Sequence, residues 1–280
     1  MATLAYRIVN VFTQDRRALS GNPLCVFESG TDLDTVTMQA LARQFNLSET
    51  TFILPSTKAH ARVRIFTPSY EMPFAGHPTL GTAFVCRALG LGADELTLEM
   101  QAGLIPVRAT GDRWTFQARP ATWRELAEST ATLAAALGIH ASDIAARPLW
   151  VKAGKEQLIV PLSSEVAVRR VRPDSAALSS IVSEDGHSMA YVFAELGHER
   201  VLSRFFFPNG TSFLEDPATG SATANYGGWL IAMGRTPCRR DISQGEYAAR
   251  PSSLHLTVDA EQRIFVAGDV VELGRGTLHL

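Results

Sequence analysis

Three polar segments hold the residues whose types and spacing could perform chemistry: Ser48–Thr50, Phe74–Thr79 and Glu215–Thr223. The first contains Glu49, which precedes the strand-like residues Thr51–Leu54. A carboxyl group in a partly apolar cleft is desolvated, and desolvation favours its protonated form near neutral pH. Such a group can both give and take a proton, as an isomerisation requires.

The other two segments each open a helix, so the chain contains this pattern twice. Residues 75–79 (AGHPT) precede the apolar run Leu80–Leu89, and residues 219–223 (TGSAT) precede Ala224–Met233. The two patterns are 144 residues apart in a chain of 280. The start of a helix has free N–H groups and about half a positive charge, so it attracts anions. Two such helices favour a cleft that holds an acidic small molecule between two similar lobes.

The residues at these helix starts have individual predicted roles. Pro78 suits the first helical position, and Ser221 is a favoured N-cap that can also contact a ligand. His77 is a poor cap, and the helix dipole should keep it neutral as a hydrogen-bonding partner. Gly76 and Gly220 let backbone N–H groups approach a carboxylate closely.

Composition and missing motifs exclude several functional classes. The net charge is −2 without a basic block, which gives no sign of nucleic-acid binding. No apolar stretch approaches the roughly 18 residues of a membrane span. The N-terminus lacks a signal-peptide layout, and the scattered Cys25, Cys86 and Cys238 indicate free thiols, so we expect a cytoplasmic protein. Metal, dinucleotide, phosphate-loop and serine-hydrolase motifs are missing, so we expect no metal ion and no cofactor.

Hydrophobic periodicity predicts the elements that position these segments. Strands are expected at Ala5–Phe12, Leu24–Phe27, Thr51–Leu54, Ala61–Phe66, Leu96–Met100, Ile105–Ala109, Trp114–Ala118, Pro148–Val151, Gln157–Pro161, Met189–Phe193, Val201–Phe207, Leu254–Val258, Ile264–Ala267, Asp269–Glu272 and Thr277–Leu280. Further helices are expected at Asp34–Phe45, Ala127–Leu137 and Ser175–Ile181.

Short strands with one long apolar helix per half predict an α+β fold in which a curved mixed sheet surrounds a central helix, made twice. A linker at 119–122 separates an N-terminal lobe, 1–118, from a C-terminal lobe, 119–275. The last strand, 276–280, is expected to complete the N-terminal lobe.

Several motifs resemble the PhzF-type (phenazine-biosynthesis-like) isomerase family, in its order and over almost the whole chain. They are Gly21-Asn22-Pro23, Leu47-Ser48-Glu49-Thr50, Pro73–Thr79, Glu215–Ala222, Gln244-Gly245 and Arg250-Pro251-Ser252. The resemblance implies the diaminopimelate-epimerase fold, with two pseudo-symmetric lobes and the active site between them. It also implies a homodimer.

The resemblance also implies which residues act. In the related epimerases and proline racemases, a cysteine precedes the glycine of each helix-opening motif, but here these positions are Ala75 and Thr219. Racemisation by two thiols is therefore not expected, and the family's acid/base residue corresponds to Glu49. The predicted catalytic residues are Glu49, His77 and Asp216, and the predicted substrate-binding residues are Asn22, Ser48, Gly76, Gly220 and Ser221.

Three functions remain open from the sequence. The first is a cofactor-free isomerase that moves a proton within a small carboxylic acid, cyclic or amino-acid-like. The second is a racemase or epimerase that works with one carboxylate, and the third is a non-catalytic metabolite-binding protein of the same fold. The motifs describe the scaffold and the acid/base site, so they leave the substrate open. The sharpest expectation is that Glu49, His77, Asp216 and Ser221 line one cleft between the lobes.

Overall fold

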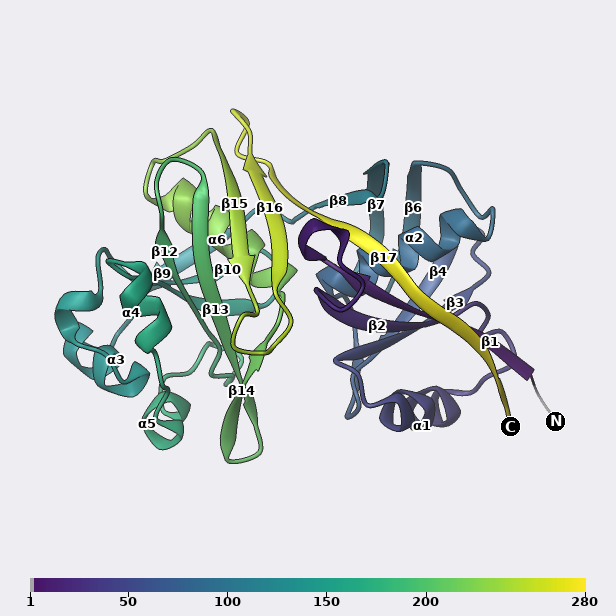
Figure 1. Cartoon of the computed structure of the whole chain (residues 1–280), viewed down its shortest axis with the longest axis horizontal. Coiled ribbons are helices and arrows are strands. Elements are labelled where there is room, and N and C mark those ends of the chain that lie inside the picture. The colour runs from purple at the N-terminus through teal and green to yellow at the C-terminus, as the bar shows by residue number, and fades with distance from the viewer. Residues whose placement is uncertain (1–2) are drawn as a thin grey trace. The chain divides into compact units, whose positions relative to one another are not determined.

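The structure, a computed structural model, describes residues 3–280 and divides into two compact units (Figure 1). The first unit comprises the chain up to Gln117 together with Ala267–Leu280, and the second is Ala118–Val266. The segment that returns to the first unit is therefore longer than the 276–280 expected from the sequence. Three short predicted strands are instead one continuous strand, β17 (Ile264–His279). Gly268 lies within this strand and makes room for Phe12, whose ring would lie 2.1 Å from an added Cβ.

Among the residues that the structure describes, the first unit contains most of β17, eight further strands and three helices. The strands are β1 (Thr3–Val11), β2 (Asn22–Phe27), β3 (Glu49–Leu54), β4 (Ala61–Phe66), β5 (Glu71–Met72), β6 (Glu95–Met100), β7 (Gly103–Thr110) and β8 (Arg113–Gln117). The helices are the 3₁₀ turn η1 (Gln14–Arg16), α1 (Thr35–Phe45) and α2 (Gly76–Ala88).

Sheet pairing in the first unit is mixed. β1 pairs antiparallel with both β2 and β17, and β2 pairs parallel with β3. β3 pairs antiparallel with β4, which is antiparallel to β5 and parallel to β6. β6, β7 and β8 follow as antiparallel neighbours. The parallel pairing of β2 with β3 places the beginnings of both strands at the same edge of the sheet.

Helix α2 is buried against the strands of its unit and contacts β1, β2, β3, β4, β6 and β8. Gly81 allows this close packing, because an added Cβ would lie 2.6 Å from Leu24 and 2.9 Å from Val11. A helix that is apolar on nearly all faces has to lie inside the protein. The first turn of α2 is thereby fixed relative to β2 and β3.

Helix α1 covers β3 and β4, and its ends agree with the sequence. The Asp34 carboxylate accepts a hydrogen bond from the Thr37 N–H at 2.8 Å, and Asn46 ends the helix with φ of 51°. Such caps satisfy backbone groups that a helix leaves open at its ends. Phe52 of β3 stacks on Phe27 of β2 with ring centroids 4.8 Å apart. This core holds the segment that follows α1, which leads directly into Glu49.

The second unit contains eight complete strands and five helices. The strands are β9 (Thr122–Glu125), β10 (Leu149–Lys152), β11 (Glu156–Pro161), β12 (Ala190–Glu195), β13 (Arg200–Asn209), β14 (Ser212–Asp216), β15 (Cys238–Gln244) and β16 (Ser252–Val258). The helices are α3 (Thr130–Leu137), η2 (Ala141–Asp143), α4 (Glu165–Arg170), α5 (Ser175–Ser179) and α6 (Gly220–Ala232).

The strands of the second unit also form a mixed sheet. β10 pairs antiparallel with β9 and β11, β11 is parallel to β12, and β12 is antiparallel to β13. β13 pairs antiparallel with β14 and parallel with β15, which is antiparallel to β16. Helix α6 contacts β9, β10, β11 and β16. Gly228 permits this contact, since an added Cβ would lie 2.6 Å from Ala121 and 2.7 Å from Val151.

Helices α3, α4 and α5 lie at one side of the second unit in Figure 1 and enclose a separate apolar core. Helix α4 packs against β12 and β13. Helices α2 and α6 are each 13 residues long and each begin at a glycine, Gly76 and Gly220. The repeated sequence pattern thus corresponds to two buried helices, one in each unit.

Candidate active site

The first unit gathers five of the predicted site residues at one edge of its sheet. Asn22 begins β2, Glu49 begins β3, and Gly76 and His77 begin α2. The pairing of Leu24 with Glu49 sets the parallel register that brings the two strand starts together. The Ser48 hydroxyl donates a hydrogen bond to the side-chain oxygen of Asn22 at 3.3 Å, and Asn22 is fully buried.

His77 and Glu49 face each other within this first cluster. The Nε2 atom of His77 lies 3.3 Å from Oε2 of Glu49, and the two side chains are 7% and 14% exposed. Both atoms are shielded from solvent. A separation of 3.3 Å is within reach of a proton shared between the atoms, and contacts of this kind tighten when a substrate binds.

The tautomer of His77 follows from its second contact. The imidazole hydrogen bonds to the backbone of Pro23, which has no N–H and therefore accepts through its carbonyl. Since Nε2 faces Glu49, the donor to Pro23 is Nδ1–H. Burial lowers the pKa of His77 to about 3, and the bond to Pro23 opposes this shift. His77 is thus neutral, as the sequence predicted, but burial rather than the helix dipole is the main cause.

Tyr70 is a neighbour of Glu49 that the sequence did not reveal. Its side chain is about half exposed, and burial together with the nearby Glu49 carboxylate raises the pKa of the Tyr70 phenol. Tyr70 follows the predicted strand Ala61–Phe66 in a polar turn. A tyrosine in such a turn gives no local signal that it approaches an acidic group.

The second unit holds the other predicted residues around the start of α6. Asp216 ends β14, and its carboxylate accepts a short hydrogen bond from the Thr219 hydroxyl. The Gln244 amide donates both to that hydroxyl, at 3.0 Å, and to the carbonyl of Asp216, at 2.8 Å. Gln244 is buried, so this bonding fixes the loop between β14 and α6.

Gly245 also supports this loop. It has φ of +83°, and an added Cβ would lie 2.4 Å from the carbonyl oxygen of Pro217 and 2.3 Å from that of Arg250. Only glycine combines this backbone conformation with such close approach. The Gln244-Gly245 motif therefore packs against the residue that follows Asp216.

The helix starts differ in detail from the predictions. Pro78 is the third residue of α2 rather than the first, and Thr219, not Ser221, is the N-cap of α6. Proline is tolerated here because none of the first N–H groups needs an intrahelical partner. The Thr219 hydroxyl makes no capping bond, since it bonds to Asp216. Ser221 lies inside the first turn, where its hydroxyl accepts a hydrogen bond from Gln157 at 3.1 Å.

The predicted site residues thus form two clusters, one in each unit. The first-unit cluster contains Asn22, Ser48, Glu49, Gly76 and His77. The second-unit cluster contains Asp216, Gly220 and Ser221.

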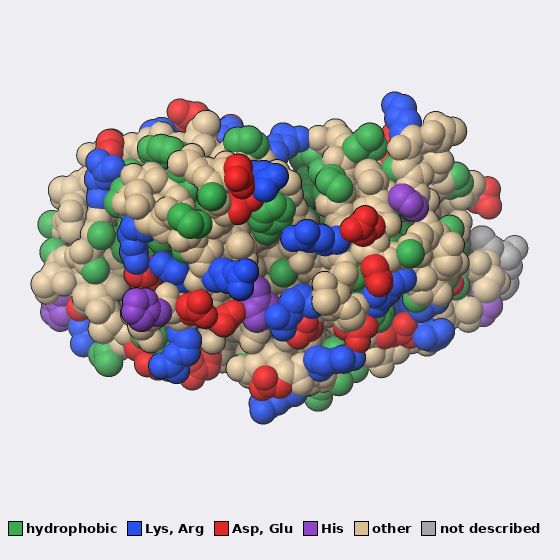
Figure 2. Space-filling view, turned by 90° about the horizontal axis from the view of Figure 1, so that it is seen from above, with side chains coloured by type: hydrophobic (Ala, Val, Ile, Leu, Met, Phe, Trp, Pro, Cys, Tyr) green, Lys and Arg blue, Asp and Glu red, His purple; other side chains and the backbone are tan. Residues whose placement is uncertain are grey.

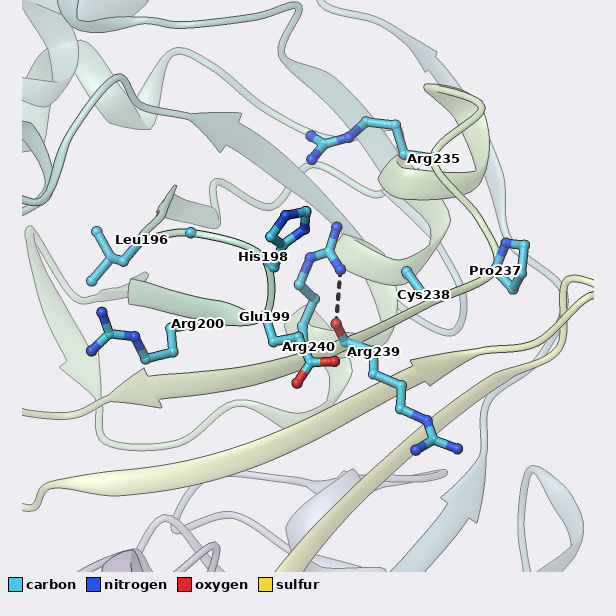
Figure 3. Close-up of a pocket in the computed structure, with 10 residues that line it drawn as sticks. Leu196, His198, Glu199, Arg200, Arg235, Pro237, Cys238, Arg239 and Arg240 are labelled. Carbon is cyan, nitrogen blue, oxygen red and sulfur yellow. Dashed lines mark hydrogen bonds between the residues drawn. The ribbon is translucent and has the colours of Figure 1, made fainter.

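An open pocket of about 790 Å³ in the second unit contains none of these residues. It is lined by residues 196–200, after β12, and by Arg235 and residues 237–240, before and within β15. Glu195 pairs with Arg235 at 2.6 Å. The side chains of Arg200, Arg235 and Arg239 point in different directions (Figure 3), so they do not converge on one ligand.

The cysteines do not supply an alternative acid/base pair. Cys25 and Cys86 are buried in β2 and α2, and burial raises the pKa of both thiols, that of Cys86 to about 12. Both thiols therefore stay protonated near neutral pH. Neither stands at a helix start, where Ala75 and Thr219 occupy the corresponding positions.

The surface carries charges of both signs. Figure 2 shows acidic and basic side chains interspersed over the face in view. Within residues 3–280, no helix combines the length and the apolar character needed to cross a membrane. The same residues contain no group of three or more His, Cys, Asp or Glu side chains arranged to hold a metal ion.

Comparison with known proteins decides the family. The model of the PhzC-PhzF family, described as phenazine biosynthesis-like protein, matches residues 9–276. The chain belongs to this family. A trans-2,3-dihydro-3-hydroxyanthranilate isomerase of Pseudomonas chlororaphis is 38% identical over 291 residues, covering 98% of this chain and 99% of the relative. An uncharacterised isomerase of Pasteurella multocida is 38% identical over 278 residues, covering 98% and 93%. The PhzF-family chain is accordingly an isomerase.

Solved structures show the same fold. A PhzF-family phenazine biosynthesis protein of Bacillus anthracis has a TM-score of 0.87 at 24% identity and covers all of both chains. A hydroxyproline epimerase of Agrobacterium vitis has a TM-score of 0.64 at 13% identity and covers 99% of this chain and 93% of the epimerase. The PhzF-family chain therefore has a mixed α/β, strand-rich fold shared with proline-racemase-like proteins.

Proposed function

We propose that this PhzF-family chain is a cofactor-independent isomerase that moves a proton within a small carboxylic acid, with Glu49 as the acid/base. The contact between Oε2 of Glu49 and Nε2 of His77, 3.3 Å long and shielded from solvent, carries this proposal. Burial makes the ionised form of a carboxyl group costly, so a protonated Glu49 beside a neutral imidazole is poised to give its proton to a substrate.

The positions of the protons on His77 and Glu49 define the role of each residue. Nδ1–H of His77 is engaged by the Pro23 carbonyl, so Nε2 presents a lone pair to Glu49. A protonated Glu49 donates to this lone pair and can hand the same proton to a substrate carbon. An ionised Glu49 takes a proton from another carbon of the substrate, and the double bonds shift between the two positions. No step requires a metal ion or a cofactor.

The second-unit cluster is proposed to bind polar groups of the substrate. The first turn of α6 offers the N–H groups of Gly220 and Ser221, which have no partner within the helix. Such N–H groups and the positive end of the helix dipole favour a carboxylate. Asp216, held by Thr219 and Gln244, is an acceptor suited to an ammonium or hydroxyl group of the substrate.

The substrate class follows from these groups together with the relatives. Donors at a helix start and a carboxylate acceptor suit a small acid that also carries an amine or hydroxyl group. Trans-2,3-dihydro-3-hydroxyanthranilate, the compound in the name of the Pseudomonas chlororaphis relative, has this chemistry. We propose a ring acid of this kind as the substrate and a homodimer as the working form.

The test uses proton NMR of the purified protein incubated with trans-2,3-dihydro-3-hydroxyanthranilate and a panel of small cyclic and amino acids. We expect one compound to convert into an isomer with a shifted double bond. A parallel incubation in D₂O identifies the carbon that receives the proton. Inversion of one carbon without a double-bond shift would instead indicate an epimerase. Binding without conversion of any compound would overturn the enzymatic proposal.

A further inference from the structure

A chain of buried and partly buried hydrogen bonds connects the start of α6 to strand β11. The Gln157 amide N–H donates to the Ser221 hydroxyl at 3.1 Å, and the amide N–H of Asn225 donates to Oε1 of Gln157 at 2.7 Å. Asn225 also donates to the carbonyl of Lys155 at 2.9 Å and accepts from the N–H of Ala153 at 2.7 Å. Gln157 and Asn225 are 2% and 1% exposed, so water does not compete for these groups.

Two backbone groups fix the direction of every bond in this chain. The Ala153 N–H can only donate, so the atom of Asn225 that faces it is the oxygen. The Asn225 nitrogen therefore points to the Lys155 carbonyl, which can only accept, and to Gln157. Gln157 consequently receives this bond on its oxygen and presents its N–H to Ser221. The orientation of both amides follows from donor and acceptor chemistry alone.

These bonds define the direction in which the Ser221 hydroxyl can donate a hydrogen bond. Because its oxygen accepts from Gln157, its hydrogen cannot point toward Gln157 and is directed elsewhere. Ser221 is the only partly exposed member of the trio, whereas Gln157 and Asn225 are buried. The hydroxyl therefore offers a donor on its accessible side, beside the N–H groups of the first turn of α6.

We infer that Gln157 and Asn225 are positioning residues that hold the Ser221 hydroxyl as a hydrogen-bond donor, so that the start of α6 selects a carboxylate oxygen of the substrate. This inference rests on the proposed function, in which Ser221 contacts substrate. A hydroxyl free to rotate would bind a donor or an acceptor equally well. A fixed donor strengthens binding of an acceptor and disfavours a group that can only donate, such as an ammonium, at the same place.

The test is a set of variants assayed with the compound that is turned over in the NMR experiment above. Gln157→Glu keeps the shape of the side chain and its acceptor for Asn225 but replaces the donor to Ser221 by an acceptor. The hydroxyl must then turn its hydrogen toward the introduced carboxylate. Gln157→Leu removes the donor without adding charge and serves as the matched control for electrostatic repulsion.

We expect Gln157→Glu to raise KM at least ~10-fold, the loss of one hydrogen bond to a charged group, with a smaller change in kcat. Gln157→Leu should raise KM less, because the hydroxyl can still rotate toward substrate. In a Ser221→Ala background neither substitution should raise KM further. Lowering the pH should restore the KM of Gln157→Glu toward that of the wild type at the same pH, since a protonated carboxyl group donates again.

Three results would overturn the inference. A KM for Gln157→Glu equal to that of the wild type would mean that the polarity of the bond is irrelevant. An equal rise of KM with and without Ser221→Ala would show that Gln157 acts by charge or by folding. An unchanged KM in Ser221→Ala alone would show that Ser221 does not contact the substrate. If the wild-type protein converts no compound in the NMR experiment, the proposed function itself is refuted. Thermal melting verifies that each variant is folded. If Gln157→Glu does not fold, the KM of Gln157→Leu with and without Ser221→Ala decides the question.

Discussion

The buried, neutral His77 should make the stability of the protein depend on pH. Its pKa is about 3 in the folded protein and 6.5 as an ordinary histidine. Between these values the unfolded chain binds one more proton than the folded protein. Acid therefore favours the unfolded state, and the free energy of unfolding falls as the pH falls below 6.5.

The magnitude follows from the two pKa values of His77. Each pH unit inside this window costs about 1.4 kcal/mol. Lowering the pH from 7.5 to 5.0 should therefore remove about 2 kcal/mol of stability through His77 alone. His77→Gln keeps a polar side chain of similar reach but cannot titrate. The variant should lose about 2 kcal/mol less than the wild type over this pH change.

The assay is urea unfolding of both proteins at pH 7.5 and 5.0, followed by tryptophan fluorescence. Other titrating groups cancel in the comparison, except for Glu49, which faces His77. A second comparison, of Glu49→Gln with the double variant Glu49→Gln/His77→Gln, removes this exception because neither protein contains Glu49. Equal pH dependence with and without His77 in both backgrounds would refute the conclusion that burial keeps the imidazole neutral.

Three further predictions concern cofactors, the second-unit loop and assembly. Activity should survive exhaustive dialysis against a chelator and need no nucleotide or flavin; restoration of lost activity by an added metal ion would contradict this. Gly245→Ala should lower the free energy of unfolding by more than Gly210→Ala and reduce turnover, because both have positive φ but an added Cβ at Gly210 meets no atom within 4 Å. Strain from φ alone accounts for about 1–3 kcal/mol, so equal urea midpoints for the two variants would show that the contact with Pro217 is unimportant. Light scattering should give twice the 30.4 kDa of one chain, and a value near 30.4 kDa at micromolar concentration would refute the homodimer.

The sequence predicted helices and strands well where periodicity is strong. The cap of α1 at Asp34 and the strand at Ala61–Phe66 are as expected. β14 (Ser212–Asp216) was missed because it is short and ends in two acidic residues. β17 was predicted as three pieces, with breaks at Gly268 and at 273–276, although these residues lie within one strand.

The residue types at the candidate site could be predicted from the sequence, but contacts between residues distant in the sequence could not. The motifs indicated Glu49 and His77 from their residue types, but their 3.3 Å separation depends on the parallel register of β2 and β3. The neutrality of His77 was attributed to a helix dipole, whereas its main cause is burial, which only packing determines. Gln157 lies 64 positions before Ser221 in a strand whose pattern gives no sign of a polar contact.

Turnover by Glu49→Gln tests the central claim most directly. Glutamine is nearly isosteric with glutamate and can still contact His77, but it cannot carry the transferred proton. With the compound converted by the wild type, kcat should fall at least ~10²-fold while thermal melting and substrate binding are retained. Turnover equal to that of the wild type would contradict the assignment of Glu49 as the acid/base.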